Sequence, residues 1–326
     1  MPRPSEDTLI ARYFAPLAAE GGLGLRDDAA RVRPPPGHDL VLTADALVAG
    51  GHFFADDPPE SIARKALGVN VSDLAAKGAE PLGFLLSLAL PADWEEPWLA
   101  AFAEGLGIAA REWRCPLLGG DTVRASGGLT LSVTALGTVP AGRMIPRTGA
   151  RPGDLVCVTG TIGDAALGLA LRGGPAWGGA LGRDHRAHLA DRYLHPRPRI
   201  GFAAALREHA QAAMDVSDGL LGDFAKLCRA SGVSGAIDAD TVPFSPAALA
   251  AVALDRALAE RCLTGGDDYE ILCTLAPDRV AAAQLEARRM GLALTSIGVI
   301  EEGSGMPRVR GRGGERAITE GSFSHF

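Results

Sequence analysis

The chain contains very little lysine, and this excludes one large class of nucleotide-binding proteins. Only three of its 32 basic residues are lysines (Lys65, Lys77 and Lys226), and none of them follows a glycine. A Walker A loop needs a Gly-Lys-[Ser/Thr] sequence to hold the phosphates of a nucleotide, so this chain has no such loop. The dinucleotide-binding fingerprint G-x-G-x-x-G is also absent. Any nucleotide chemistry must therefore use other groups.

Net positive charge and long apolar runs are lacking as well. The formal net charge is -7 and the isoelectric point is near 5.5, which leaves no basic face for a nucleic-acid backbone or an anionic membrane. No run of about 18 apolar residues is present, and the N-terminus carries acidic residues where a signal peptide needs an apolar stretch. We therefore expect a cytoplasmic protein that binds neither nucleic acid nor membrane.

Cysteine is sparse and shows no metal-binding or redox spacing. The chain has five cysteines, an odd number without any C-x-x-C pair, so they cannot all pair within one chain. We interpret them as reduced, mostly buried residues that behave as small apolar side chains. They are Cys115, Cys157, Cys228, Cys262 and Cys273.

The length and apolar content allow two domains. The chain has 326 residues, 47% of them hydrophobic, which exceeds the ~150 residues of a typical single domain. The segment 147–154 (RTGARPGD) concentrates glycine, proline and charge. We place the domain boundary there, giving domains 1–148 and 149–326.

The spacing of apolar residues predicts alternating helices and strands, and hence an α+β fold. Segment 172–184 has the glycine-rich composition of a mobile loop. At the N-terminus, Ser5 is placed to cap the first predicted helix. Helices are predicted over 7–18, 60–78, 94–113, 163–171, 197–210, 217–232, 247–261 and 278–291. Strands are predicted over 39–45, 83–91, 115–121, 128–139, 155–160, 212–216, 234–240, 269–275 and 294–300.

Aspartates recur at the ends of apolar stretches, next to glycine or a small polar residue. A single such aspartate is more often a turn or helix cap, and Asp218 could simply cap the helix that contains Lys226. Six such motifs together favour a binding site for several divalent cations, and oxygen ligands without nearby histidine or cysteine favour Mg²⁺ over Zn²⁺. The aspartates are Asp27, Asp28, Asp45, Asp73, Asp121, Asp215, Asp218, Asp267 and Asp268.

Cations held by aspartates, without a Walker A lysine, indicate phosphate chemistry. Arg147 is either a phosphate clamp or an ordinary surface arginine. His52 lies among glycines and aromatics, where it contacts a ligand or serves the structure. Ser217 either caps a helix or places its hydroxyl and amide on a phosphate.

These motifs together resemble the thiamine-monophosphate kinase family, in order and over nearly the whole chain. VSDG, GGDDYE and the closing aromatic-x-His-Phe are the specific signals, whereas NVSDLAAKGA is shared in type with the wider superfamily that includes aminoimidazole ribonucleotide synthetase. The similar segments are LIARYF (9–14), DDAA (27–30), LTADALVAGGHF (42–53), KALGVNVSDLAAKGAEP (65–81), LLGGDT (117–122), RTGARPGDLVCVTGTIGDAALGL (147–169), HPRPRI (195–200), MDVSDGL (214–220), GGDDYE (265–270) and SFSHF (322–326).

The resemblance implies a fold and a reaction. Domain 1–148 would be an α/β domain that binds ATP and Mg²⁺ and whose strands form a shared barrel across a homodimer. Domain 149–326 would be an α+β domain that completes the active-site cleft. The implied reaction is direct transfer of the γ-phosphoryl group of ATP to thiamine monophosphate, which gives thiamine diphosphate and ADP.

The resemblance also assigns roles, motif by motif. Asp73, Asp218 and Arg147 are the implied catalytic residues. The implied ligands of several Mg²⁺ ions are Asp28, Thr43, Asp45, Asp73, Asp121, Asp215 and Asp218. The implied ATP contacts are Gly120, Asp121, Arg147 and Ser217, and the implied contacts of thiamine monophosphate are His52, Asp267 and Phe323.

The chain departs from the family pattern at three places, and two other functions stay open. Ala44 stands where a second hydroxyl residue is usual, Asp267 stands where glutamate is usual, and the C-terminal motif has one extra residue. One alternative is an amidine-forming synthetase that acts on a ribonucleotide. The other is a non-catalytic nucleotide-binding paralogue, which would be expected to have lost the carboxylates. Selenophosphate synthesis is disfavoured because the N-terminal segment has neither cysteine nor lysine before Lys65.

Overall fold

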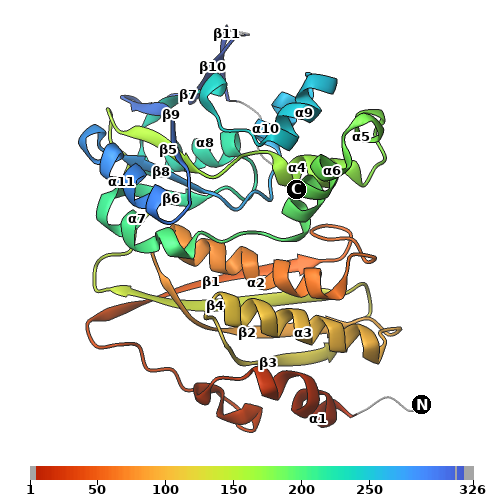
Figure 1. The fold of residues 1–326 in the computed structure, drawn as a ribbon. Helices are drawn as coiled ribbons and strands as arrows, with labels where there is room; N and C mark the ends of the chain where they lie inside the picture. Colours follow the sequence, from red (N-terminus) through yellow and green to blue (C-terminus); the bar gives the residue numbers. More distant parts are fainter. Residues whose placement is uncertain (1–4, 313, 319–326) are drawn as a thin grey trace. The chain divides into compact units, whose positions relative to one another are not determined.

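The computed structural model describes residues 5–312 and 314–318, and the chain divides into two compact units. The first unit comprises residues up to Leu74 together with 79–143, and the second comprises 75–78 together with the residues from Met144 onward. Figure 1 shows both units in sequence colours. Each is described by itself.

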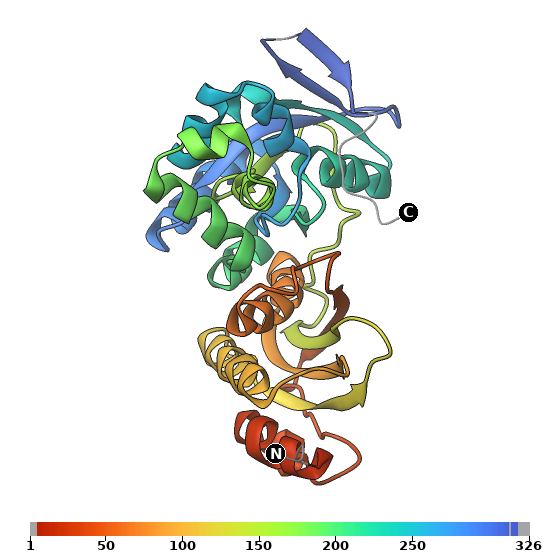
Figure 2. The same cartoon turned by 90° about the vertical axis from the view of Figure 1, so that its right-hand side faces the viewer.

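The first unit is a four-stranded sheet in the order β1-β4-β2-β3. Strands β2 and β3 are parallel, whereas β4 pairs antiparallel with both β1 and β2. The two long helices, α2 and α3, cover one face of this sheet (Figure 2). The elements are β1 (His38–Val48), α2 (Pro59–Ala76), β2 (Glu80–Leu90), α3 (Glu96–Glu112), β3 (Leu117–Arg124) and β4 (Thr130–Pro140).

The other face of this sheet carries exposed apolar side chains. Along β1, Val41 and Leu47 are buried while Leu40 and Leu42 are 43% and 61% exposed, as expected when alternate residues point to opposite faces. Leu85 on β2 and Val123 on β3 are also exposed, at 38% and 49%. A row of apolar residues across several strands is a surface that favours a covering partner. We call Leu40, Leu42, Leu85 and Val123 the open face.

The helix predicted over 7–18 is correct in place but not in form. Ser5 caps α1 (Glu6–Leu9), and its Oγ accepts the Thr8 N–H at 3.3 Å, as predicted. The chain then winds as a π-helix over Ile10–Phe14 and as a 3₁₀-helix over Ala15–Leu17. Pro16 lies in that last segment and has no N–H to continue the α-helical ladder. A further 3₁₀ segment, Glu20–Leu25, precedes the acidic Asp27-Asp28 pair.

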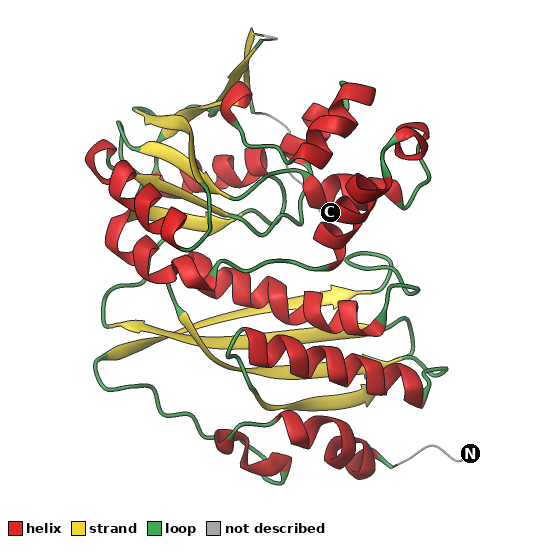
Figure 3. Ribbon diagram, in the orientation of Figure 1, coloured by secondary structure: helices red, strands yellow, loops and turns green. Residues whose placement is uncertain are grey.

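The second unit is built on a seven-stranded mixed sheet in the order β11-β10-β7-β9-β5-β8-β6. Figure 3 shows its strands with helices on both sides. Its strands are β5 (Leu155–Thr159), β6 (Ala210–Asp215), β7 (Ser234–Asp238), β8 (Ile271–Leu275), β9 (Leu294–Glu301), β10 (Arg308–Gly311) and β11 (Gly314–Ala317). Its helices are α4 (Asp164–Leu171), α5 (Ala176–Ala180), α6 (Arg183–Leu194), α7 (Ala203–His209), α8 (Leu220–Ser231), α9 (Pro246–Leu254), α10 (Leu258–Thr264) and α11 (Pro277–Arg289).

Alternation along β8 explains the two cores of this unit. Leu272 belongs to the core in which Phe224 of α8 packs on the sheet. Its neighbours Ile271 and Cys273 belong to the core formed by α7 and α11 on the opposite face, which includes Phe202. The second unit is therefore a three-layer α/β/α structure.

Two predictions in the second unit are wrong in detail. The segment 172–184 is not a plain loop, because it contains α5 and the start of α6, and Trp177 packs against the helical core that includes Leu181. The single helix predicted over 247–261 is two helices, α9 and α10. Asp255 separates them: its backbone is extended, and its Oδ1 accepts the Ala257 N–H at 3.0 Å.

The interpretation of the cysteines is confirmed: all five are free and buried. Burial raises the pKa of Cys115, Cys157, Cys228 and Cys262 to about 12. At neutral pH these groups are thiols rather than reactive thiolates. Among the residues that the structure describes, no helix has both the length and the apolar character needed to cross a bilayer.

Candidate functional site

A group of oxygen donors lies where β1 meets α2 in the first unit. The Thr43 hydroxyl donates to Asp73 Oδ2 at 2.5 Å, and Asp45 lies two residues further along β1, on the same face of the strand. The buried Asn70 fixes this arrangement, because its Oδ1 accepts the Asp45 N–H and its Nδ2 donates to Ala66 O, both at 3.0 Å. We call Thr43, Asp45 and Asp73 the β1 group, and their role as Mg²⁺ ligands stays a prediction.

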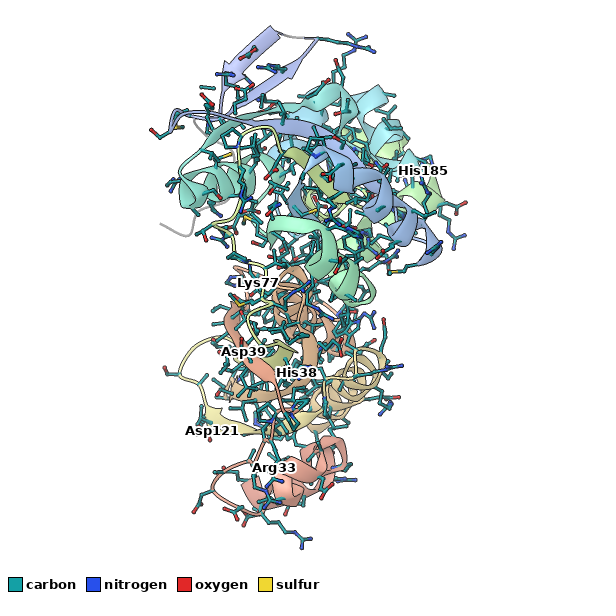
Figure 4. All side chains as sticks on the ribbon, turned by 90° about the vertical axis from the view of Figure 1, so that its left-hand side faces the viewer. Arg33, His38, Asp39, Lys77, Asp121 and His185 are labelled. Atoms are coloured by element: carbon teal, nitrogen blue, oxygen red, sulfur yellow. The ribbon has the colours of Figure 1, made fainter. Side chains whose placement is uncertain are left out.

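A second group lines a cavity of about 810 Å³ in the same unit, and it includes Asp28, Gly120 and Asp121. Glycine is required at 120, because a Cβ there would lie 1.9 Å from the carbonyl oxygen of Leu86. The close approach of β3 to β2 therefore depends on this residue. Figure 4 marks Asp121 on β3 and, on β1, Asp39. We call Asp28, Gly120 and Asp121 the β3 group.

His52 lies in the turn that follows β1. The backbone N–H of Val48 donates to His52 Nδ1 at 3.1 Å. A ring nitrogen that accepts a hydrogen bond carries no proton, so the neutral ring carries its proton on Nε2. His52 therefore presents a hydrogen-bond donor to its surroundings.

In the second unit, the segments MDVSDG and GGDDYE lie side by side. The N–H groups of Asp267 and Tyr269 donate to the carbonyls of Ser217 and Val216, at 2.8 and 2.9 Å, and the Val216 N–H donates to Glu270 O at 2.8 Å. The fit is close enough to require glycine, since a Cβ at Gly266 would lie 2.1 Å from the Ser217 oxygen. Backbone hydrogen bonds thus join two motifs that are 50 residues apart in the sequence.

The turn at Ser217-Asp218 is held by a buried carboxylate. Asp223 Oδ2 accepts the backbone N–H groups of Ser217 and Asp218, each at 3.0 Å, and its Oδ1 accepts from Lys226 Nζ at 2.9 Å. Lys226 also donates to Asp218 Oδ2. The helix cap is Gly219 rather than Asp218, which leaves the Asp218 carboxylate out of the capping role that was the alternative.

Asp267 has an unusual backbone conformation. Its φ is +70° and that of Tyr269 is +51°, values that non-glycine residues seldom adopt and that cluster at functional sites. The Tyr269 hydroxyl donates to Asp267 Oδ1 at 3.1 Å. Asp267 itself is partly exposed, whereas Asp268 and Glu270 are fully buried.

The comparison with known proteins identifies the family. The patterns described as AIR synthase related protein, N-terminal and C-terminal domain, match residues 26–139 and 151–308. Thiamine-monophosphate kinase of Caulobacter vibrioides is 42% identical over 308 residues, which cover 93% of this chain and 86% of that protein. The chain belongs to the thiamine-monophosphate kinase family.

Solved structures agree with this assignment. The crystal structure of thiamine-monophosphate kinase from Stenotrophomonas maltophilia K279a has a TM-score of 0.79 at 41% identity, with 89% of this chain and 90% of that one covered. AaThiL complexed with AMPPCP and TMP also has a TM-score of 0.79, at 31% identity over 98% of this chain and 94% of that one. The resemblance drawn from the sequence is therefore confirmed, and so is a fold of two domains with mixed α/β sheets.

Four charged residues behind Asp267 were not predicted as part of the kinase site. Asp268 accepts the Gly163 N–H at 2.7 Å, and burial raises its pKa well above the usual range. Glu270 accepts from Arg192 Nη2 at 3.1 Å and from Arg199 Nε at 2.6 Å. Asp268 and Glu270 belong to GGDDYE and Arg199 to HPRPRI, so the family-like segments contain three of the four residues. Together these residues anchor the loop that presents Asp267.

The other predicted site residues are Arg147, Asp215 and Phe323. Arg147 has an exposed side chain, and its carbonyl accepts from Ser231 Oγ at 2.9 Å. Asp215 is buried at the end of β6. Phe323 lies outside the described residues.

The donor chemistry of the predicted ligands fits Mg²⁺. Within residues 5–312 and 314–318, no group of three or more His, Cys, Asp or Glu side chains is placed to hold a metal ion. The donors in each group are carboxylate and hydroxyl oxygens, which are the ligands that Mg²⁺ prefers. Within the first unit, the β1 group and the β3 group are therefore two sets of donors, each with chemistry that suits Mg²⁺.

Proposed function

We propose that this chain transfers the γ-phosphoryl group of ATP directly to the phosphate of thiamine monophosphate, giving thiamine diphosphate and ADP. The observation that carries the proposal is the likeness to thiamine-monophosphate kinases along 93% of the chain, with every carboxylate of the implied site present. A relative complexed with AMPPCP and TMP matches 98% of the chain. The need for ATP and the five reduced cysteines favour a cytoplasmic location.

In this proposal the two domains divide the work. Domain 1–148 supplies the β1 group, the β3 group and His52, and domain 149–326 supplies further carboxylates and the other two substrate contacts. Bound Mg²⁺ supplies neutralisation of phosphate charge in place of a Walker A lysine. Its ligands would be Asp28, Thr43, Asp45, Asp73, Asp121, Asp215 and Asp218. ATP would be contacted by Gly120, Asp121, Arg147 and Ser217, and thiamine monophosphate by His52, Asp267 and Phe323.

The residues of the chain orient two anionic groups rather than activate a nucleophile. An acceptor phosphate is already ionised at neutral pH, so no base has to remove a proton. The Arg147 guanidinium can pair with phosphate oxygens through its planar fork. Asp267, partly exposed beside the backbone of Ser217, suits the cationic ring of thiamine.

The decisive test of the function is whether ADP release depends on thiamine monophosphate. We expect purified protein with ATP and Mg²⁺ to release ADP in step with thiamine diphosphate, both quantified by liquid chromatography, only when thiamine monophosphate is added. A synthetase would release ADP with a ribonucleotide and an amide-type donor instead. A non-catalytic paralogue would release none. Either of these results contradicts the proposal.

We also propose that the chain acts as a homodimer through the sheet of the first unit. The open face (Leu40, Leu42, Leu85 and Val123) consists of exposed apolar side chains, which strand alternation directs away from the face that α2 and α3 cover. Burying such a face against its own copy removes apolar area from water at about 25 cal/mol per Å². Strands β1 and β3 are the two edges of the sheet, so pairing each with the partner's other edge would close a shared barrel without free edges.

The strand order gives this dimer a role in the site. Asp45 on β1 and Asp121 on β3 are separated by three strand spacings, which is about 14 Å. One chain therefore cannot place both carboxylates on the same cation. In the proposed barrel, β3 of the partner lies beside β1, one strand spacing away. We therefore propose that the β1 group, on the α2 side of one sheet, and the β3 group of the other chain contribute to one site.

Mixed dimers test this arrangement. We expect Asp45→Asn and Asp121→Asn each to inactivate the homodimer, while a heterodimer of the two variants, isolated with two affinity tags, recovers about half of the wild-type turnover. The reason is that one of its two sites combines both substitutions and the other combines none. An inactive heterodimer would place both residues in one chain's site, and a strict monomer in light scattering would refute the dimer itself.

A further inference from the structure

We propose that Lys226 is a positioning residue for Asp218: its ammonium group binds the Asp218 carboxylate and competes there with a divalent cation. The inference rests on the proposed role of Asp218 as a metal ligand. It adds a residue that neither the motifs nor the family comparison assigns to the site. The Lys226 ammonium is then a positive charge that the chain itself supplies beside the carboxylates of Asp218 and Asp223.

The contacts of Lys226 are directed at two carboxylates. Its Nζ donates to Asp218 Oδ2 and, at 2.9 Å, to Asp223 Oδ1. The side chains of Lys226 and Asp218 are 30% and 38% exposed, whereas that of Asp223 is fully buried. The ammonium therefore bridges an accessible carboxylate and an inaccessible one.

The position of the Asp223 carboxylate does not depend on what the Asp218 carboxylate binds. Besides Lys226, it accepts two backbone N–H groups, those of Ser217 and Asp218, so three donors hold one buried carboxylate. Charge-assisted bonds of this kind are among the stronger hydrogen bonds. Lys226 thus stays tethered to Asp223 when Asp218 exchanges its partner, and the turn at Ser217-Asp218 keeps its backbone shape.

Asp218 is the member that can change partners. Its carboxylate is the more exposed of the two, and it takes no part in capping α8, whose cap is Gly219. With Lys226 in place, two carboxylates share one positive charge, which lowers the attraction of the site for a further cation. The other two lysines are engaged elsewhere: Lys77, labelled in Figure 4, donates to Ala213 O at 2.6 Å, and Lys65 is buried within α2.

The competition predicts that removing the ammonium strengthens cation binding. For Lys226→Met we expect the dissociation constant of Mn²⁺, measured by electron paramagnetic resonance on the full chain with a non-hydrolysable ATP analogue, to fall about fivefold, the size of an exposed ion pair. The Mg²⁺ concentration for half-maximal activity should fall in parallel. Lys226→Arg, which keeps the charge, should restore the wild-type value within twofold.

Two further variants make the test specific. Arg229→Met removes one positive charge from the exposed side of the same helix and should leave Mn²⁺ affinity unchanged, which separates a local effect from net charge. Lys226→Gln removes the charge but keeps a hydrogen-bond donor for Asp223. If Lys226→Met does not fold, Lys226→Gln should show the same fall in the dissociation constant of Mn²⁺.

Unchanged or weaker Mn²⁺ binding in both uncharged variants would overturn the proposal while leaving the kinase function intact. Asp218→Asn should weaken Mn²⁺ binding. If it does not, Asp218 is not a metal ligand, and this inference falls together with that part of the proposed site.

Discussion

Replacement of Asp73 by asparagine should lower kcat by about 10²–10³-fold, the usual cost of losing one group that stabilises charge in a transition state. Asp73 is the acceptor of the Thr43 hydroxyl at 2.5 Å. Asparagine has the same shape and can still accept that hydrogen bond, so the fold of the β1 group should persist. What is lost is the negative charge that would hold Mg²⁺ against the phosphates. The measurement is steady-state turnover with saturating ATP and thiamine monophosphate, paired with a thermal melt to show that the variant is folded.

A matched control lies on β1, the strand that carries Thr43 and Asp45 of the β1 group. Asp39 of β1 accepts the Gly142 N–H at 2.8 Å and is exposed, and Asp39→Asn should leave turnover within about twofold because surface changes of this kind have small effects. EDTA should abolish the activity of the unaltered protein. Full activity of Asp73→Asn, or of the wild type in EDTA, would exclude Mg²⁺-assisted transfer through the β1 group.

The elements that apolar patterning predicts best are those whose packing is local and regular. The buried runs at 83–91 and 128–139 are strands β2 and β4, and the stretches at 60–78 and 94–113 are helices α2 and α3. Patterning fails at α6, which is rich in charged residues, and at the short hairpin of β10 and β11, where four residues per strand leave no period to detect. Patterning also did not separate α9 from α10, because the break depends on a single side-chain hydrogen bond at Asp255.

The site shows the same division between local and long-range information. VSDG and GGDDYE are recognisable as separate motifs. The sequence does not show that they pair through Ser217 and Asp267, because these residues are 50 positions apart and local periodicity says nothing about contacts at that separation. The role of Asp223 is hidden for a different reason: an aspartate in the first turn of a helix has a sufficient local explanation in the helix dipole. The separation of Asp45 from Asp121 follows only from strand order, which periodicity does not determine.

The choice of acceptor should be strict: thiamine monophosphate should be phosphorylated, and free thiamine should react at least about 10²-fold more slowly, since a missing general base costs 10²–10⁴-fold. Free thiamine presents an alcohol, whose proton must be removed during transfer. His52 is the residue best placed by sequence to act as that base, yet its Nδ1 already accepts the Val48 N–H, and its other nitrogen then carries a proton. His52 can donate to a phosphate oxygen but has no free lone pair for an alcohol.

The comparison needs both acceptors at matched concentrations with ATP and Mg²⁺, and it measures ADP together with the phosphorylated product. His52→Gln provides a control, because glutamine keeps an N–H donor and cannot act as a base. If His52 serves as a donor, this variant should retain most of its turnover of thiamine monophosphate and gain nothing with thiamine. Equal turnover of thiamine and its monophosphate by the wild type would show that an alcohol is activated, and the assignment of a phosphate acceptor would be wrong even if ATP and Mg²⁺ are required.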